Sequence, residues 1–372
     1  MKFKWFRRAD KRVAEGDVDN QQAERTSCDD VLPESNEMAD RPISSSEKGH
    51  SSAPVDLNSP SGKSKGFQQD FKEAAKWFLL YAQQGDVRAQ TNVGLLYYEG
   101  KGVTQDFQEA MKWFRRAADS GDERAQYYLG VMYGKGRGVP QDSKEAAKWF
   151  RLAAEQGDSK SNTNLGVMYG KGEGVSQDLH ESVRRYRIAA EKGNAEAQYC
   201  LGDIYSKGKG VPQDWHEAAK WYRLAAEQGS SDAQYCLGNM YFQGKGVPQD
   251  FRETEKWFRL AAWHGVAEAQ YGLGCLYSKG EGIEKDYEKA VKLFRAAAEQ
   301  GNSKAQCSLG FMYHLGRGIQ KDVIHAYAWF NVAGAAGDEK ASAQRAQIMK
   351  HMTATQLEDG RRLSREFERY IK

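Results

Sequence analysis

The sequence has no long apolar run, since no stretch of its 372 residues approaches the roughly 18 apolar residues of a membrane span. Its basic start is followed by no apolar segment, so we expect no secretory signal. Cysteine is scarce, and the five residues Cys28, Cys200, Cys236, Cys275 and Cys307 form no CxxC pair. We therefore expect reduced thiols in a cytoplasmic protein. Charge of one sign is also lacking, because the formal net charge is only +3, which gives no general attraction to nucleic acid or membranes.

Glycine, in contrast, is abundant and recurs every 36 residues without insertion. One series is Gly85, Gly121, Gly157, Gly193, Gly229, Gly265, Gly301 and Gly337. A second is Gly94, Gly130, Gly166, Gly202, Gly238, Gly274 and Gly310, and an acidic one is Asp106, Asp142, Asp178, Asp214, Asp250, Asp286 and Asp322. Three series in one register predict a repeat protein with seven complete repeats over residues 86–337.

Each repeat has the pattern of two helices joined by short polar loops. In residues 125–133 the apolar side chains recur at three- and four-residue spacing, which predicts a first helix with one buried stripe. Asp142 is placed to cap a second helix, and Glu145 to complete a variant of the capping box. Gly157 suits the left-handed position that ends a helix. We therefore predict an all-α solenoid of antiparallel helix pairs.

Three segments of one repeat unit resemble the Sel-one-like repeat family, a branch of the tetratricopeptide-like solenoids. They are Ala-Glu-Ala-Gln-Tyr-Cys-Leu-Gly-Asp-Ile-Tyr (195–205), Gly-Lys-Gly-Val-Pro-Gln-Asp (208–214) and Glu-Ala-Ala-Lys-Trp-Tyr-Arg-Leu-Ala-Ala-Glu-Gln-Gly (217–229). The resemblance implies a right-handed α/α superhelical solenoid that acts as an adaptor for a protein partner, without catalysis or cofactor. It also links bacterial members to signalling, envelope-complex assembly and host interaction.

We expect four parts in the chain. Residues 1–13 form a basic and aromatic segment, and residues 14–66 a disordered polar and acidic linker with ten serines and no Phe, Trp or Tyr. Residues 67–350 form the solenoid, with a half-repeat at 67–85, the full repeats at 86–337 and a degenerate helix at 338–350. Residues 351–372 form a capping helix, because a solenoid needs a polar end to cover its core.

The hexapeptide Lys4-Trp5-Phe6-Arg7-Arg8-Ala9 repeats Lys112-Trp113-Phe114-Arg115-Arg116-Ala117, three periods later. Three explanations are open: chance similarity in a frayed terminus, a docking helix that imitates a repeat helix, and a membrane-surface contact through residues 1–12.

Several motifs have a structural and a chemical interpretation. The Gly-x-Gly loops lack the strand context and the Lys-Ser of a phosphate-binding loop, which favours a structural turn. Six tryptophans share one repeat position, which favours core packing over a platform for nucleic-acid bases; they are Trp77, Trp113, Trp149, Trp221, Trp257 and Trp329. His180 and His216 belong to no HExxH motif, and a metal shared by Cys200 and Cys236 is the weaker interpretation, so we predict no metal site.

The positions that vary within first helices fall on one helical face, which by resemblance is the concave, ligand-bearing side. The candidate partner-binding residues on this face are Arg88, Asn92, Arg124, Tyr128, Lys135, Lys160, Asn164, Lys171, Glu196, Asp203, Asp232, Asn239, Phe311 and Leu315. The alternative is sequence drift on an ordinary solvated face. A rival function, an enzyme with a hydrolase-like activity, requires a polar cluster with perturbed pKa values in a pocket.

Overall fold

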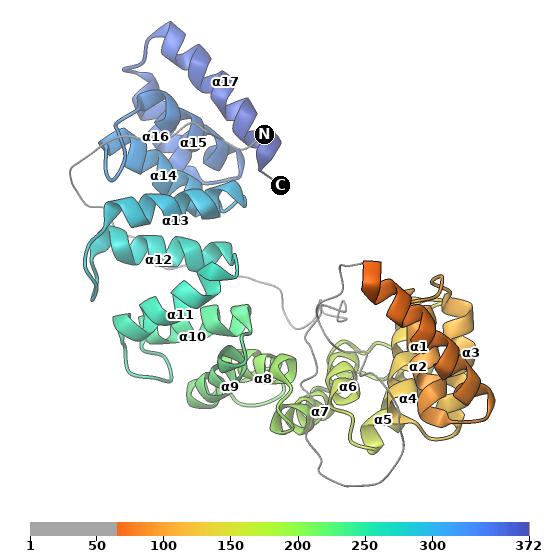
Figure 1. Cartoon of the computed structure of the whole chain (residues 1–372). Helices are drawn as coiled ribbons and strands as arrows, with labels where there is room; N and C mark the ends of the chain where they lie inside the picture. Colours follow the sequence, from red (N-terminus) through yellow and green to blue (C-terminus); the bar gives the residue numbers. More distant parts are fainter. Residues whose placement is uncertain (1–64, 372) are drawn as a thin grey trace. The chain divides into compact units, whose positions relative to one another are not determined.

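The computed structural model describes residues 65–371 and divides them into two compact units, residues 65–212 and residues 213–371. All regular elements in this range are α-helices (Figure 1). The first unit contains α1 (Lys65–Gln83), α2 (Val87–Glu99), α3 (Phe107–Asp119), α4 (Glu123–Lys135), α5 (Ser143–Glu155), α6 (Ser159–Lys171), α7 (Leu179–Glu191) and α8 (Ala195–Lys207). The second contains α9 (Trp215–Glu227), α10 (Ser231–Gln243), α11 (Phe251–Trp263), α12 (Ala267–Lys279), α13 (Tyr287–Glu299), α14 (Ser303–Leu315), α15 (Val323–Ala335), α16 (Glu339–Met349) and α17 (Ala354–Tyr370). The predicted helix pairs of 36 residues are confirmed, whereas the expectations for residues 1–64 lie outside the described residues.

Both helices of a repeat begin at side-chain caps. Asp122 accepts a hydrogen bond from the amide of Ala125 at 2.8 Å, and α4 starts there. Asp142 accepts from the amides of Lys144 and Glu145 at 2.9 and 3.1 Å, and α5 starts there. The acidic series therefore caps the second helices as predicted, and each such cap stabilises its helix by about 0.5–2 kcal/mol.

The capping-box prediction was wrong at Asp142. The carboxylate of Glu145 does not return to the cap amide but pairs with Lys148, one turn further along α5. A lysine three residues after the glutamate competes for the carboxylate, and the sequence repeats this pair at Glu217 and Lys220, with 3.2 Å between the charged atoms. The reciprocal capping box is instead present at Thr353, before α17.

The Gly-x-Gly loops are structural turns, as predicted. Gly136 ends α4 in the left-handed conformation with a φ of 65°. Gly138 has a φ of 73°, and a Cβ at this position would lie 2.6 Å from the carbonyl oxygen of Phe107 at the start of α3. The first glycine thus terminates one helix, and the second allows the loop to touch the second helix of the preceding repeat.

The core of a repeat forms where a helical glycine meets an aromatic ring. Gly130 of α4 faces Phe150 of α5, and both residues are buried. Behind this contact, the buried Gln126 donates its side-chain N–H to the carbonyl of Ala118 at 3.3 Å, joining α4 to the end of α3. The same bond recurs at Gln198, Gln234, Gln270 and Gln306. Where this position is glutamine, its side chain therefore holds consecutive helices together. At the one other residue type in the full repeats, Asn162, the side chain donates to the carbonyl of Asp158 at 2.9 Å.

The tryptophan series is buried at five of its six positions. Trp113, Trp149, Trp221, Trp257 and Trp329 are between 4% and 8% exposed, which confirms the prediction of core packing for them. The prediction was wrong for Trp77, which is 52% exposed. Trp113, for example, packs in a cluster with Ala82 of α1 and Val93 of α2, the two helices that precede its own. Trp77 lies on α1, which has no helix before it among the described residues.

The last helices of the second unit pack around α15. The ring of Phe367 on α17 stacks on Trp329 with 4.2 Å between ring centroids, and Gly360 lies against Tyr327. Seven charged side chains of α17 are exposed: Glu358, Arg361, Arg362, Arg365, Glu366, Glu368 and Arg369. The role of α17 as a stabilising cap stays a prediction.

The cap of α15 gives a pH-dependent test of the fold. The Asp322 carboxylate accepts from the amides of Ile324 and His325 at 2.9 and 3.0 Å and lies 2.7 Å from the His325 ring nitrogen. The hydrogen bond from the His325 side chain lowers the pKa of Asp322. A lowered folded-state pKa means that this stabilisation is present above the unfolded value of about 3.9 and is lost as pH falls through the folded value.

We therefore expect Asp322→Ala to lower the free energy of unfolding by about 0.5–2 kcal/mol at pH 7. Urea unfolding followed by circular dichroism should show the difference between the two proteins shrinking below about pH 4. Asp322→Ser, which keeps a capping oxygen, should recover most of the loss at pH 7. If wild type and Asp322→Ala differed equally in unfolding free energy at pH 3 and pH 7, the ionised Asp322 carboxylate would not be the source of the stabilisation.

Candidate binding surface

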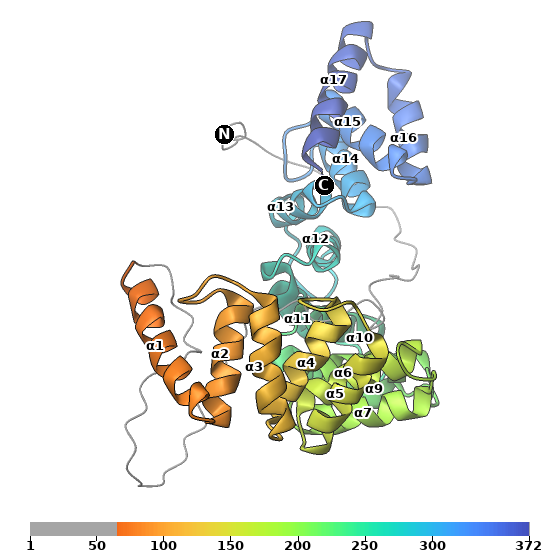
Figure 2. The same cartoon turned by 90° about the vertical axis from the view of Figure 1, so that its right-hand side faces the viewer.

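The candidate residues lie on the first helices, and most of them have accessible side chains. In the first unit, Arg88, Arg124 and Lys160 are exposed at the starts of α2, α4 and α6, one repeat apart. Figure 2 labels these three helices. The residues that are partly exposed in this unit are Asn92, Tyr128, Lys135, Lys171 and Glu196. In the second unit, Asp232 and Leu315 are exposed, and Asn239 and Phe311 are partly exposed.

Two candidates offer almost no surface. Asn164 is 2% exposed, and its side-chain amide donates to the carbonyl of Lys160 at 2.9 Å. Asp203 is 7% exposed and pairs with Lys207 at 2.6 Å. Both lie in the middle of a first helix, where the packing of neighbouring helices covers them. In this conformation neither residue can contact a partner without a local rearrangement.

The three exposed cationic candidates of the first unit have no ion-pair partner within residues 65–371. They are Arg88, Arg124 and Lys160. The lysines of second helices behave differently, because Lys112 and Lys148 each pair with a glutamate three residues earlier on the same helix. Positive charge is thus paired locally at these two lysines and is left available at the starts of α2, α4 and α6, as it also is at Arg116 and Lys144 of second helices.

The acidic candidate Glu196 lies in the first turn of α8 and is half-buried. Burial raises the pKa of its carboxyl group, because a low-polarity environment disfavours the charged form. A negative charge at the start of a helix is otherwise favoured by the helix dipole. Glu196 is therefore a weaker electrostatic contact for a partner than the exposed cations of the same unit.

The apolar candidates of the second unit differ in accessibility. Phe311 meets Phe330 edge to face with 5.0 Å between centroids, and the Lys340 ammonium lies 5.5 Å from its ring. Leu315, at the end of α14, is more exposed. Phe311 is thus partly a core residue, and only one part of its ring is available to a partner.

Sequence reasoning missed the exposed aromatic and aliphatic residues of the second helices. Trp263 is 87% exposed at the end of α11, and Leu260 is exposed one turn before it. The corresponding position in other repeats is glutamate, as at Glu155, Glu191 and Glu227. The departure from glutamate is a signal in the sequence that marks position 263 as different from its counterparts.

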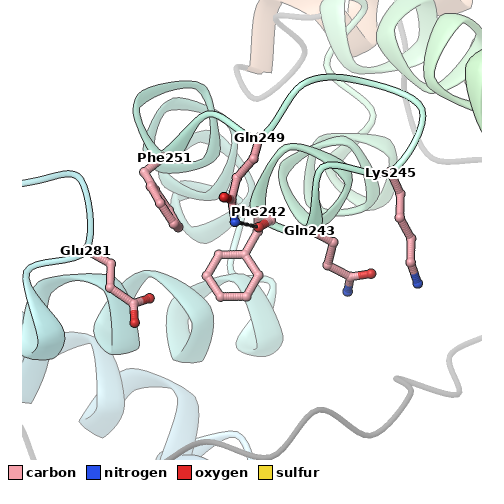
Figure 3. A pocket seen from close by; sticks show the side chains of 6 residues that line it. All are labelled: Phe242, Gln243, Lys245, Gln249, Phe251 and Glu281. Atoms are coloured by element: carbon pink, nitrogen blue, oxygen red, sulfur yellow. Dashed lines mark hydrogen bonds between the residues drawn. The ribbon is translucent and has the colours of Figure 1, made fainter.

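An open hollow of about 430 Å³ lies beside the loop between α10 and α11 (Figure 3). Its lining residues are Phe242, Gln243, Lys245, Gln249, Phe251 and Glu281. The Gln249 side chain donates to the carbonyl of Phe242 at 2.8 Å, and the rings of Phe242 and Phe251 meet edge to face. The same glutamine-to-carbonyl bond closes the loop at Gln141. These residues therefore shape a repeat loop, and their arrangement resembles no nucleophile–base pair.

The ionisable groups that burial perturbs are packed among helices. Burial raises the pKa of the Cys275 thiol to about 11 and that of Cys307 to about 12, so both stay protonated near neutral pH. A reactive cysteine needs a lowered pKa.

Across residues 65–371, no group of three or more His, Cys, Asp or Glu side chains is arranged to hold a metal ion. In the same range, no helix has the length and apolar character that crossing a membrane requires.

A family model described as Sel1 repeat matches residues 62–86, 87–122, 123–158, 159–194, 195–230, 231–265, 267–302 and 303–338. Among solved structures, a Sel1 repeat protein from Oxalobacter formigenes is 36% identical, covers 77% of this chain and 83% of its own, and has a TM-score of 0.58. The protective antigen c5321 of uropathogenic Escherichia coli, which displays an SLR fold, is 32% identical over 81% of this chain and 80% of its own, with a TM-score of 0.41. The immunity protein Pa5087 of Pseudomonas aeruginosa is 19% identical over 57% of this chain and 83% of its own, with a TM-score of 0.37. None of the curated proteins matches the chain.

Proposed function

This chain belongs to the Sel1 repeat family, and from that premise we propose that it is a non-catalytic scaffold that binds a protein partner. Repeat solenoids use extended surfaces built from successive repeats to hold peptides and helices. The partner's peptide or helix lies along the first helices, in the groove that this side forms in related solenoids. A cytoplasmic location and a role in signalling, complex assembly or host interaction are part of the proposal.

The observation that carries the proposal is the row of exposed, unpaired cations on α2, α4 and α6. Arg88, Arg124 and Lys160 recur once per repeat, so they present charges along the array rather than at one point. Such a row suits an extended segment with acidic side chains at intervals. Surface charges of this kind contribute mainly to the association rate and to partner selectivity.

Affinity capture with two charge-reversed proteins tests the proposal. The full chain and its double variant Arg124→Glu/Lys160→Glu are each immobilised and exposed to an extract of the source cells. Proteins retained by the wild type should be lost or strongly depleted on the double variant, because its surface repels an acidic segment.

The matched control is Lys112→Glu/Lys148→Glu, which changes the net charge equally but on the second helices. Fully exposed ion pairs of this type contribute little to the stability of a helix, so the control should stay folded. It should also retain the same proteins as the wild type. Equal depletion on both variants, with unchanged circular dichroism, would contradict a first-helix binding surface.

A further inference from the structure

The helix α1 has an exposed apolar face. Trp77 and Tyr81 are 52% and 49% exposed, one turn apart on one side of the helix. The counterparts of Tyr81 in later second helices, such as Ala117 and Ala153, are buried. Leu80 is 45% exposed, but its counterparts Leu152, Leu224 and Leu260 are exposed as well, so it is not part of this face. Large exposed apolar groups at a position that is buried elsewhere in the array indicate a site for another segment. We call Trp77 and Tyr81 the α1 face.

Later repeats show what covers this position. Trp113 of α3 packs in a cluster with Leu79 of α1, the residue two positions after Trp77. Trp149 of α5 packs in a cluster with Phe114, and the Arg115 guanidinium lies 4.8 Å from the centroid of its ring. Arg115 again lies two positions after a tryptophan of the preceding second helix. In both repeats the residue two positions after the preceding tryptophan therefore lies at the next tryptophan. For Trp113, the first-helix residues Ala89 and Val93 belong to the same cluster.

The chain contains a second copy of the covering segment. Lys4-Trp5-Phe6-Arg7-Arg8-Ala9 is identical to residues 112–117 of α3, and Arg7 occupies the place of Arg115. Six identical consecutive residues include the tryptophan, the phenylalanine that follows it and the arginine that lies over the next tryptophan. The segment lies outside the described residues, so its docking is argued from this match and from the α1 face.

We propose that residues 1–12 dock as a helix on the α1 face, with the Arg7 guanidinium over the Trp77 ring as Arg115 lies over Trp149. The segment then serves as the second helix of a missing preceding repeat and closes this end of the array. Its composition fits the site, because it carries six basic side chains, and cations are attracted to the faces of exposed aromatic rings.

The intervening chain is long enough for this contact. Residues 13–64 supply 52 residues, and a random coil of that length reaches roughly 40 Å. The 19 residues of α1 extend over roughly 28 Å. A tethered segment has a high effective concentration at a site within its reach, which favours docking on its own chain over docking on a second copy.

Photo-crosslinking of the full chain tests this proposal. Phe6 is replaced by p-benzoylphenylalanine, because its counterpart Phe78 packs in the cluster of Trp113. After irradiation of the monomer, mass spectrometry should find the crosslink within residues 71–83 of the same chain. Arg7→Glu and Trp77→Ala should each lower the yield at least tenfold. Arg25→Glu, with the same charge change outside the docked segment, should keep it within twofold.

Three results would overturn the proposal. One is a crosslink that joins two chains, which would make a second copy the occupant. Another is a crosslink outside α1, or one that Arg7→Glu and Arg25→Glu reduce equally. The third is crosslinking to vesicles of phosphatidylserine and phosphatidylcholine in place of α1, which would assign the segment to membranes. None of these results bears on partner binding by the first helices, so the two proposals are tested separately.

Discussion

Replacing Gly130 by alanine is expected to lower the stability of residues 65–212 by about 1–3 kcal/mol, although only one methyl group is added. A Cβ at Gly130 would lie 2.6 Å from two carbon atoms of the Phe150 ring. The ring is 1% exposed, so it has no free space into which it can move. The midpoint of urea unfolding, followed by circular dichroism, measures the loss.

Gly134→Ala, on the same helix, is the matched control. A Cβ at Gly134 would have an ordinary contact of 3.8 Å with Ala146. Alanine is a better helix former than glycine by about 0.5–1 kcal/mol, so this variant should be neutral or slightly more stable. If Gly130→Ala and Gly134→Ala shifted the urea midpoint equally, the close contact between Gly130 and the Phe150 ring would not explain the stability of the α4–α5 pair.

Replacing Trp257 by alanine is expected to destabilise residues 213–371 by about 3–5 kcal/mol, the usual cost of deleting a buried aromatic side chain. Trp257 is 6% exposed, and its indole N–H donates to Glu253 at 2.9 Å. Thermal and urea unfolding should therefore show a large loss.

Trp263→Ala provides the comparison within the same helix, because Trp263 is 87% exposed. Its removal should change stability by about 0.5 kcal/mol or less, as for most surface substitutions. Equal losses of unfolding free energy in Trp257→Ala and Trp263→Ala would show that burial does not distinguish these two tryptophans.

Periodicity in the sequence predicted the helices well because local rules fix their ends. Asp142 caps α5, and Gly136 ends α4, and each depends on a few neighbouring residues. Glu145 was assigned wrongly because Lys148 competes for its carboxylate, and both partners were visible in the sequence. The family resemblance was confirmed by the repeat matches.

The candidate surface was less predictable, because burial depends on how neighbouring helices pack. Helical spacing put Asn164 and Lys160 on one face, yet the first is buried and the second is exposed. The exposure of Trp77 was unpredictable for the same reason. Its repeat position predicts the buried environment of Trp149, but α1 is the first described helix, and no described helix before it covers the ring. The sequence also did not show which lysines form ion pairs. Lys148 pairs with Glu145, whereas Lys160 has no ion-pair partner among the described residues.

The central claim, that a partner is held by the cations of the first helices, is tested most directly by association kinetics with a captured partner. Surface plasmon resonance is run with the wild type, Arg124→Glu/Lys160→Glu and Lys112→Glu/Lys148→Glu at low and physiological salt. The account predicts association about tenfold slower for the first variant, with a weaker dependence on salt, and rates within twofold of wild type for the second. Wild-type association rates for Arg124→Glu/Lys160→Glu, at unchanged thermal stability, would contradict it.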